Sequence, residues 1–349
     1  MAAALHQSWP PFVLIAGLLM IGLVANRDGL FAWGGARLQA LPGGAVALLA
    51  AALLLDAVVT AVLNLDTAVV FLTPVLVFAA RRRRVAVEPF LYGCVFMANA
   101  SSLFLPGSNL INLLVQDAHG GGSGASFAAA MFPIAITAAV VTAVGVALSF
   151  RRPLSLRSSG PVEEADHPQV VPGAGVLATA VAIVLVLILR NPAPEVLAVG
   201  LVAVAAELLR SRIAIADVRR VVGPLSLAAA FVLTVALGTL ARHWDGPAEL
   251  IAGASGPETA VLAALSTVLV NNLPSAALYS ARAVDHSRML LLGLNLGPNL
   301  AVTGALSALL WFRAAREVDA RPSLLEFSRR GIPLALVAMA AAIAAGSVG

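Results

Sequence analysis

Residues 99–114 read NASSLFLPGSNLINLL, and residues 295–310 read NLGPNLAVTGALSALL. Both stretches place Asn, Gly, Pro and small hydroxyl residues close together in the most apolar parts of the chain. A helix that breaks inside a membrane leaves backbone groups unpaired at several kcal/mol each, unless protein or a water-filled cavity satisfies them. We therefore expect two broken helices that line a site within a membrane protein.

The composition predicts an all-α polytopic membrane protein. Of the 349 residues, 60% are hydrophobic and only 11% are charged, and the mean hydropathy is +0.94. Apolar runs long enough to span a bilayer recur along the whole chain. All 22 basic residues are Arg and they cluster in connecting loops, which argues against nucleic acid as a partner. With one cysteine, Cys94, we expect no disulfide, no metal site and no cofactor.

The chain divides into two similar halves. Each half contains an apolar helix that opens after Pro (Pro11, Pro224), then an Asn-containing interruption (NLDT at 64–67, NNLPS at 271–275), then a broken helix. Aligning the two halves so that Asn99 matches Asn295 also matches Gly107 with Thr303. The first predicted repeat covers 1–150, with a hairpin at 44–80 and a broken helix at 89–116. A cytoplasmic linker is predicted at 151–172. The second repeat covers 173–349, with scaffold helices at 173–210, a hairpin at 257–281 and a broken helix at 288–312.

The arginines predict the orientation. If both Asn-bearing interruptions are tips of re-entrant hairpins, about eighteen arginines fall on one side of the membrane and four on the other: Arg190, Arg242, Arg282 and Arg288. The arginine-rich side is cytoplasmic by the positive-inside rule. The two repeats are then inverted relative to each other, both termini lie outside, and the linker lies inside the bacterial cytoplasmic membrane.

The breaks and tips supply the candidate site. Half-helix ends carry partial charge, and Asn, Ser and Thr add neutral hydrogen-bonding groups, so we expect a site for a small polar solute. An alternative for any single residue is that small side chains only let helices pack closely. The predicted solute-binding residues are Asn64, Thr67, Asn99, Ser101, Ser102, Ser108, Asn109, Asn271, Asn272, Asn295, Gly297, Asn299 and Thr303.

Acidic residues inside apolar segments are candidates for ion coupling. Asp66 lies at the first predicted tip, between Asn64 and Thr67, and we assign it the proton-coupling role. Asp56 lies on an arm of the first predicted hairpin and is predicted to be a buried protonated acid or a packing contact. Glu258 is predicted to cap a helix, and Glu207 is predicted to be a solvated partner of nearby arginines.

The motifs resemble those of the arsenite efflux permeases within the ion transporter superfamily. The resemblance covers nearly the whole chain and rests on LDTAVVFLTPV (65–75), ANASSLFLPGSNLINLL (98–114), NNLPSAALYSA (271–281) and GLNLGPNLAVTGALSALLWF (293–312). It implies a transporter that exports arsenite or antimonite, driven by protons or assisted by an arsenical pump ATPase. It also implies a scaffold domain, a moving transport domain and a homodimer.

Two departures from the family accompany the resemblance. Relatives usually begin about two transmembrane helices earlier, so the N-terminal scaffold helices are expected to be missing. Many relatives carry Asp where this chain has Asn99 and Asn295, and a Lys near Asn299, so neutral amides replace three charges here.

Two other function classes are alternatives to arsenite export: a different transporter of the same superfamily and an intramembrane enzyme. A sodium–proton antiporter or a carboxylate transporter of the same superfamily is the alternative, although sodium exchange would favour more intramembrane acids. An intramembrane enzyme would need a buried base, yet His6, His119, His167, His243 and His286 all fall in loops or at segment ends. Cys94 is predicted to fill space in a helix interface. The sequence therefore predicts a transporter and not an enzyme.

Overall fold

The computed structural model describes residues 1–155 and 173–347, and these residues form helices without a strand. The fold class predicted from composition is therefore confirmed as all-α. Of the predicted linker, only residues 151–155 lie in the described part. The elements before residue 156 are α1 (Ala2–Arg27), α2 (Leu30–Ala40), α3 (Ala45–Val62), α4 (Leu65–Arg82), α5 (Glu88–Ser101), η1 (Pro106–Ser108), α6 (Leu110–Ala118), α7 (Gly124–Ser149) and α8 (Arg151–Ser155).

The second half begins with two adjacent helices and then repeats the pattern of the first half. Its elements are α9 (Ala174–Ile188), α10 (Ala193–Leu209), α11 (Ile215–Val222), α12 (Pro224–Leu240), α13 (Gly246–Ala252), α14 (Gly256–Val270), α15 (Asn272–Tyr279), α16 (Ser287–Leu296), η2 (Gly297–Asn299), η3 (Val302–Gly304), α17 (Leu306–Glu317) and α18 (Leu324–Ser347). The hairpins and broken helices predicted from sequence correspond to α3–α4, α5–α6, α14–α15 and α16–α17.

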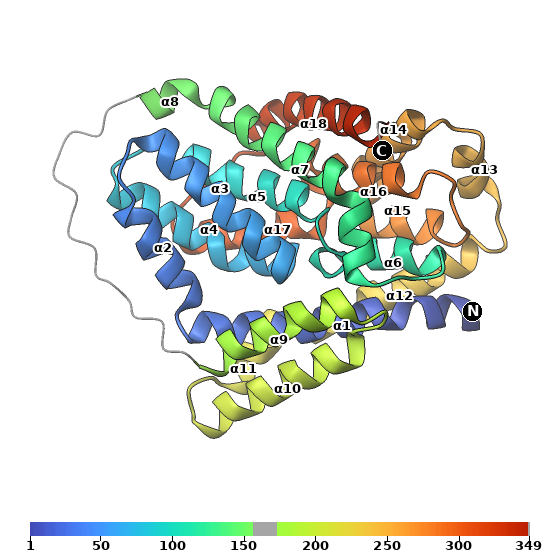
Figure 1. Cartoon of the computed structure of the whole chain (residues 1–349), viewed down its shortest axis with the longest axis horizontal. Helices are drawn as coiled ribbons and strands as arrows, with labels where there is room; N and C mark the ends of the chain where they lie inside the picture. Colours follow the sequence, from blue (N-terminus) through green and yellow to red (C-terminus); the bar gives the residue numbers. More distant parts are fainter. Residues whose placement is uncertain (156–172, 348–349) are drawn as a thin grey trace.

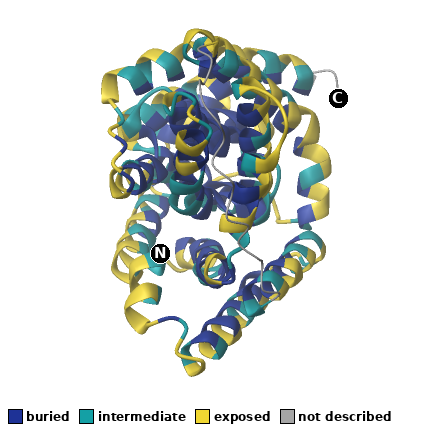
Figure 2. Cartoon of the chain, turned by 90° about the vertical axis from the view of Figure 1, so that its left-hand side faces the viewer, coloured by how far each residue is buried: buried dark blue, intermediate teal, exposed yellow. Residues whose placement is uncertain are grey.

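Several helices have the length and surface of membrane spans. Five are long and apolar enough to cross a bilayer: α1, α3, α7, the α11–α12 segment and α18. On α9, the outward face consists of Leu177, Val181, Val184 and Ile188, which are between 37% and 68% exposed. Figure 2 shows the buried residues on the inner faces of the helices and the exposed residues on the outer faces. Such an apolar outer surface is suited to lipid.

One layer of the molecule is built on close contact between α1 and α10. A Cβ atom on Gly17 would lie 2.8 Å from the backbone nitrogen of Leu197, and a Cβ on Gly200 would lie 2.7 Å from the carbonyl oxygen of Gly17. Glycine at both positions lets the two backbones touch. Helices α9 and α12 also pack on α1, and Figure 1 shows these four helices together below the rest of the fold.

Helices α3 and α4 form an antiparallel pair, which we call hairpin 1. The Asn64 side chain accepts a hydrogen bond from the backbone N–H of Thr67 (2.7 Å) and so starts α4. At the other end, Arg83 donates to the carbonyls of Leu41 (2.8 Å) and Gly43 (2.6 Å). The start of α3 and the end of α4 therefore lie next to each other.

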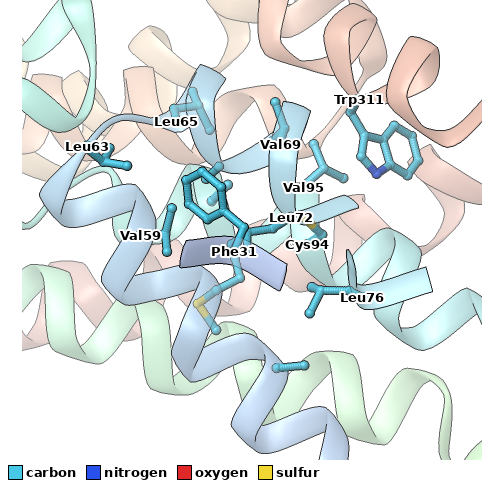
Figure 3. Close-up of a cluster of buried hydrophobic side chains, with 14 of the residues drawn as sticks. Phe31, Val59, Leu63, Leu65, Val69, Leu72, Leu76, Cys94, Val95 and Trp311 are labelled. Atoms are coloured by element: carbon cyan, nitrogen blue, oxygen red, sulfur yellow. The ribbon is translucent and has the colours of Figure 1, made fainter. Parts of the chain in front are cut away.

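Apolar side chains at helical intervals anchor hairpin 1 in the hydrophobic core. Residues Leu65, Val69, Leu72 and Leu76 recur at helical intervals along α4 and are buried. Figure 3 shows them in one cluster with Val59 of α3, Leu63 just after α3, and Phe31 of α2. Cys94 of α5 is buried at the edge of this cluster, as its predicted packing role requires.

Helices α14 and α15 form hairpin 2. Ser255 and Glu258 form a capping box at its start: the Glu258 carboxylate accepts from the Ser255 N–H (2.7 Å) and hydroxyl (2.8 Å). This confirms the predicted capping role, and the same two hydrogen bonds lower the pKa of Glu258. At the tip, the Asn271 side chain accepts from the N–H of Leu273 (3.3 Å).

The two broken helices share one backbone pattern, 196 residues apart, as Asn99 and Asn295 are. Element η1 starts at Pro106 and η3 at Val302, while α6 starts at Leu110 and α17 at Leu306. The residues before α6 and α17 have matching dihedrals, with φ −151° and ψ 139° at Asn109 and φ −150° and ψ 153° at Ala305. The alignment of Asn99 with Asn295, chosen from the sequence, therefore agrees with the backbone conformation of the two breaks.

Two pairs of helices that the predicted repeat would match, α1 with α12 and α7 with α18, pack antiparallel. Phe12 of α1 meets Phe231 of α12, with ring centroids 5.3 Å apart, while Gly238, further along α12, lies against Ala4 at the start of α1. Near the start of α18, Arg330 lies over the ring of Phe150 at the end of α7. Gly346, near the end of α18, lies against Ile134 earlier in α7. Helices α7 and α18 even carry Pro at the same position, Pro133 and Pro333.

Two sequence predictions are wrong at the level of single residues. Pro11 does not open a helix, because α1 begins at Ala2 and includes it; only Pro224 begins its helix. Glu207 is fully buried and not solvated. It pairs with Arg210 (3.1 Å) and Arg212 (3.1 Å), and Arg212 also approaches the buried Asp28 (3.6 Å). Arginines from a nearby loop thus compensate two buried acids.

Candidate functional site

The first break is stabilised by its own polar side chains. The Asn112 amide donates to the carbonyls of Ser102 (2.6 Å) and Leu105 (3.1 Å), which lie in the non-helical segment between α5 and α6. The Ser108 hydroxyl lies 3.0 Å from the same Ser102 carbonyl and also contacts the Leu105 carbonyl. These side chains replace the hydrogen bonds that the break removes, as irregular backbone in a membrane requires.

Asn295 joins the two broken helices. Its amide oxygen accepts from the Ser102 hydroxyl (2.5 Å) and from the Asn109 amide (2.9 Å). Its nitrogen donates to Asn112 (2.9 Å) and to the Leu291 carbonyl one turn earlier in α16 (2.9 Å). Both hydrogens and both lone pairs of this fully buried amide are therefore used.

A second amide contact crosses between the same helices. Asn99 donates to the side-chain oxygen of Asn299 (2.7 Å), and Asn299 donates to the Phe96 carbonyl (3.3 Å). The Asn99 oxygen and the neighbouring Ser101 hydroxyl are buried and have no partner. We call Asn99, Ser101, Ser102, Asn109, Asn112, Asn295 and Asn299 the amide cluster.

The tip of hairpin 2 reaches the second break. Asn271 donates to the Thr303 carbonyl (2.9 Å), and the Thr303 hydroxyl donates to the Val268 carbonyl of α14 (3.1 Å). Gly297 lies so close to α14 that a Cβ atom would be 2.8 Å from the Ala264 carbonyl. Asn272 is buried in the first turn of α15. These four predicted residues therefore lie along one hairpin–break contact.

The tip of hairpin 1 is less constrained by hydrogen bonds. Asn64 and Thr67 are buried, and the Asn64 amide nitrogen and the Thr67 hydroxyl have no partner. Asp66 is half-buried in the first turn of α4. Within the described residues, no hydrogen bond or ion pair engages its carboxylate. None of these tip side chains hydrogen-bonds to the amide cluster, so the structure does not join all the predicted site residues.

Sequence reasoning missed two polar residues. Asn112 belongs to the amide cluster but was not among the predicted residues, although it lies three positions after Asn109 in the same run. Gln7 donates to the carbonyls of Leu114 (3.0 Å) and Ser280 (2.9 Å), which ties α1 to α6 and to the end of hairpin 2. Nothing in the local sequence around Gln7 indicated this role.

The polar groups of the site are electrically neutral apart from Asp66. The buried polar residues of the described chain are amides, hydroxyls and three acids, with no Arg or His among them, and the chain has no Lys. The amide cluster can therefore donate to and accept from a solute but offers no cation to neutralise an anion. This arrangement suits hydroxyl-bearing, uncharged ligands.

Comparison with known proteins identifies the family. The sequence model of the citrate transporter family matches residues 2–311, which include both tips and both breaks. The chain belongs to the citrate transporter family. Like other members of the citrate transporter family, it is a multi-pass membrane transport protein, and its relatives are proteins of bacterial inner membranes.

Within the citrate transporter family, individual relatives have other names. The chain is 24% identical over 370 residues to the arsenical pump membrane protein of Escherichia coli, covering 97% of this chain and 86% of that protein. The arsenical pump membrane protein of Shigella flexneri gives the same values. The solved YdaH transporter of Alcanivorax borkumensis has a similar fold, with a TM-score of 0.56 and 14% identity over 99% of this chain and 86% of that one.

Proposed function

We propose that this protein exports arsenite or antimonite as the neutral trivalent hydroxide, by exchange for protons. The observation that carries the proposal is a set of buried, uncharged polar atoms without partners on the first tip and the first break: Asn64 Nδ2, Thr67 Oγ1, Asn99 Oδ1 and Ser101 Oγ. Burying such groups unpaired is unfavourable by about 1–3 kcal/mol each. A small solute with several hydroxyls could satisfy them, and the arsenical pump relatives support this choice.

The proposed transport cycle uses two inverted repeats, each with a re-entrant hairpin. The helix pairs α1–α12 and α7–α18 run antiparallel, and Figure 1 places α2 and α8 at one end of the molecule and the start of α1 and the end of α18 toward the other. Hairpin 1 then enters from the cytoplasm and hairpin 2 from outside, with the amide cluster between them. Alternating access at a fixed midplane site is the typical use of such symmetry. The homodimer and the ATPase partner implied by the family resemblance stay predictions.

Asp66 is the proposed proton carrier. It is the only acid at either tip, the residue is half-buried in the first turn of α4, and its carboxylate has no ion pair with described residues, so it is placed to exchange a proton as the tip moves. Moving one charge across the membrane supplies about 2.3 kcal/mol per 100 mV, whereas a tenfold gradient requires about 1.4 kcal/mol. One proton per neutral solute would thus support a gradient of roughly fiftyfold at 100 mV.

Citrate or another carboxylate is the second candidate substrate, because the matching family is named for citrate. A carboxylate brought into the membrane interior needs its charge compensated by a cationic side chain, a bound cation or the positive ends of half-helices. The buried polar residues of the described chain include no basic side chain. We therefore rank a neutral hydroxide above an organic anion.

Efflux from resting cells tests the proposal. An arsenite-sensitive bacterium is loaded with arsenite or with labelled citrate, with and without expression of this protein and with and without a proton uncoupler. We expect expression to accelerate arsenite efflux and the uncoupler to remove that acceleration. Unchanged arsenite efflux from cells that carry the protein in their membrane, or faster movement of citrate alone, would reject the proposal.

A further inference from the structure

Hairpin 1 contains a line of buried polar residues that begins at the tip, at the edge of the proposed solute site, and continues along α3 to two residues that the solute site does not use, Thr60 and Asp56. Asp56 and Thr60 lie four residues apart on α3, so they share one helix face. Asn64 follows four residues later at the tip, and Thr67 lies in the first turn of α4. All four are at most 1% exposed. We call these residues the hairpin column.

Every residue of the hairpin column has a polar atom without a protein partner: Asp56 Oδ2, Thr60 Oγ1, Asn64 Nδ2 and Thr67 Oγ1. Of the buried helical threonines outside the column, Thr142 of α7 also has an unpartnered hydroxyl, whereas five others donate to a carbonyl of their own helix. These are Thr73, Thr179, Thr234, Thr259 and Thr267. The free hydroxyl of Thr60 is therefore not a general consequence of helix burial.

The inner end of the column is a carboxyl group enclosed by three helices. Cys94 of α5 donates its S–H to Asp56 Oδ1 (3.5 Å), and its sulfur also lies 3.5 Å from the Thr73 hydroxyl of α4. The Thr73 hydroxyl donates to the Val69 carbonyl (2.6 Å), so its hydrogen is already used. Oδ2 of Asp56 is left without a partner.

No cation compensates a charge at Asp56. Among the elements packed against α3, the other titratable groups lie toward the ends of the hairpin or of α5: Arg37, Asp66, Arg81, Arg82, Glu88, Tyr92, Arg151 and Arg152. An isolated ionised carboxylate is strongly disfavoured in such surroundings. Asp56 therefore holds a proton in this conformation.

We propose that the hairpin column is a water-bridged proton path with Asp56 as its inner proton-binding group. Four residues of helix advance by about 6 Å, and one water that hydrogen-bonds on both sides spans nearly that distance, at about 2.8 Å to each partner. Buried waters typically bind otherwise unsatisfied polar groups. The path leads from the tip, where Asp66 lies, to a second carboxyl group that stores a proton.

This inference deepens the proposed function, since proton exchange gives the column a use, but its test does not require transport. The purified protein is studied by infrared spectroscopy in detergent while H₂O is replaced with D₂O. The protonated carboxyl of Asp56 gives a C=O band that Asp56→Asn removes and Asp56→Glu moves to another frequency. We expect this band to shift within the mixing time in the wild type, because the column supplies exchangeable protons.

Thr60→Val interrupts the column without changing the size of the side chain. We expect it to slow the isotope shift of the Asp56 band at least tenfold. Thr234→Val is the matched control, because Thr234 is equally buried but its hydroxyl is bonded within α12 (2.8 Å); this variant should exchange like the wild type.

Three results would reject the proposed proton path. They are a spectrum with no band that depends on Asp56, a band that does not shift in D₂O, and the same exchange rate in Thr60→Val as in the wild type. A wild type that exchanges as expected but moves no arsenite would instead reject only the proposed function. The two proposals can therefore fail separately.

Discussion

Asn295 is the residue on which the contact between the two broken helices depends most. Asn295→Ala removes four hydrogen bonds and leaves the amide oxygen of Asn112 and the amide hydrogens of Asn109 without their partner. Each buried group left unsatisfied costs about 1–3 kcal/mol. We expect a clearly lower unfolding temperature of the purified protein.

The control for this variant is Asn26→Ala, which removes an exposed amide near the end of α1. It should unfold at the temperature of the wild type. If Asn295→Ala proves as stable as Asn26→Ala, then the amide cluster does not hold the broken helices together.

Asp66 is the residue whose substitution should separate coupling from solute movement. Asp66→Asn keeps the shape of the side chain but cannot carry a proton, so we expect loss of arsenite accumulation in everted vesicles. Downhill arsenite counterflow should remain measurable. Asp217→Asn, at an exposed acid that caps α11 (2.9 Å), should accumulate arsenite normally. Uncoupler-sensitive accumulation by Asp66→Asn would assign the proton to another group.

At the scale of residues, the sequence pointed to the buried polar side chains at the breaks but not to their hydrogen-bond partners, and their role in binding a solute stays a prediction. Asn99, Asn109 and Asn295 stand out because amides are rare in apolar runs, and burial requires them to be bonded. Their pairing depends on how α5 and α16 cross, which local sequence does not specify. The same reason explains why Glu207 was wrongly predicted to be solvated. Its arginine neighbours are visible in the sequence, but only the packed loop shows that they form ion pairs with a buried Glu207.

Among the elements, α1 and α10 test whether close helix contact stabilises the fold. Gly17→Ala places a Cβ atom 2.8 Å from the backbone of α10, and overpacking of this kind costs about 1–3 kcal/mol. We expect a lower unfolding temperature for this variant. Gly253→Ala, where a Cβ meets nothing within 4 Å, should leave the unfolding temperature unchanged. Equal stability of the two variants would show that α1 and α10 are not in close contact.

The direction of α7 tests the orientation of the repeats. In a Cys94→Ser background, single cysteines replace Ser126, at the start of α7, or Ser155, in α8 after its end; both serines are exposed. We expect an impermeant thiol reagent to label the first in intact cells and the second only after lysis. The reverse labelling pattern would overturn the cytoplasmic entry of hairpin 1.

Helix boundaries follow from signals that the sequence displays. The tips at Asn64 and Asn271 and the break before α6 were predictable because Asn caps a helix and Pro or Gly interrupts one. Pro11 misled because a Pro near a helix start is often its first residue, whereas α1 extends nine residues before it. Close packing around α1 then outweighs the local signal.

At the scale of the whole molecule, the chain combines an apolar outer surface with a neutral polar centre. Arginine distribution and internal similarity predicted two halves of opposite direction, and the antiparallel contacts of α1 with α12 and of α7 with α18 fit that arrangement. Solute identity could not be read in the same way, because amides and hydroxyls bind many small molecules. It rests on the absence of basic groups among the buried described residues and on the relatives.

Uptake by purified protein into liposomes with an acidic interior tests whether the protein moves arsenite in exchange for protons. The liposomes receive arsenite or citrate outside, and protein-free liposomes and the Asn99→Ala variant serve as controls. We expect the wild type to accumulate arsenite above its external concentration while the interior becomes less acidic, and Asn99→Ala to accumulate less. Arsenite that only equilibrates, as in protein-free liposomes, or accumulation of citrate instead, would contradict this exchange.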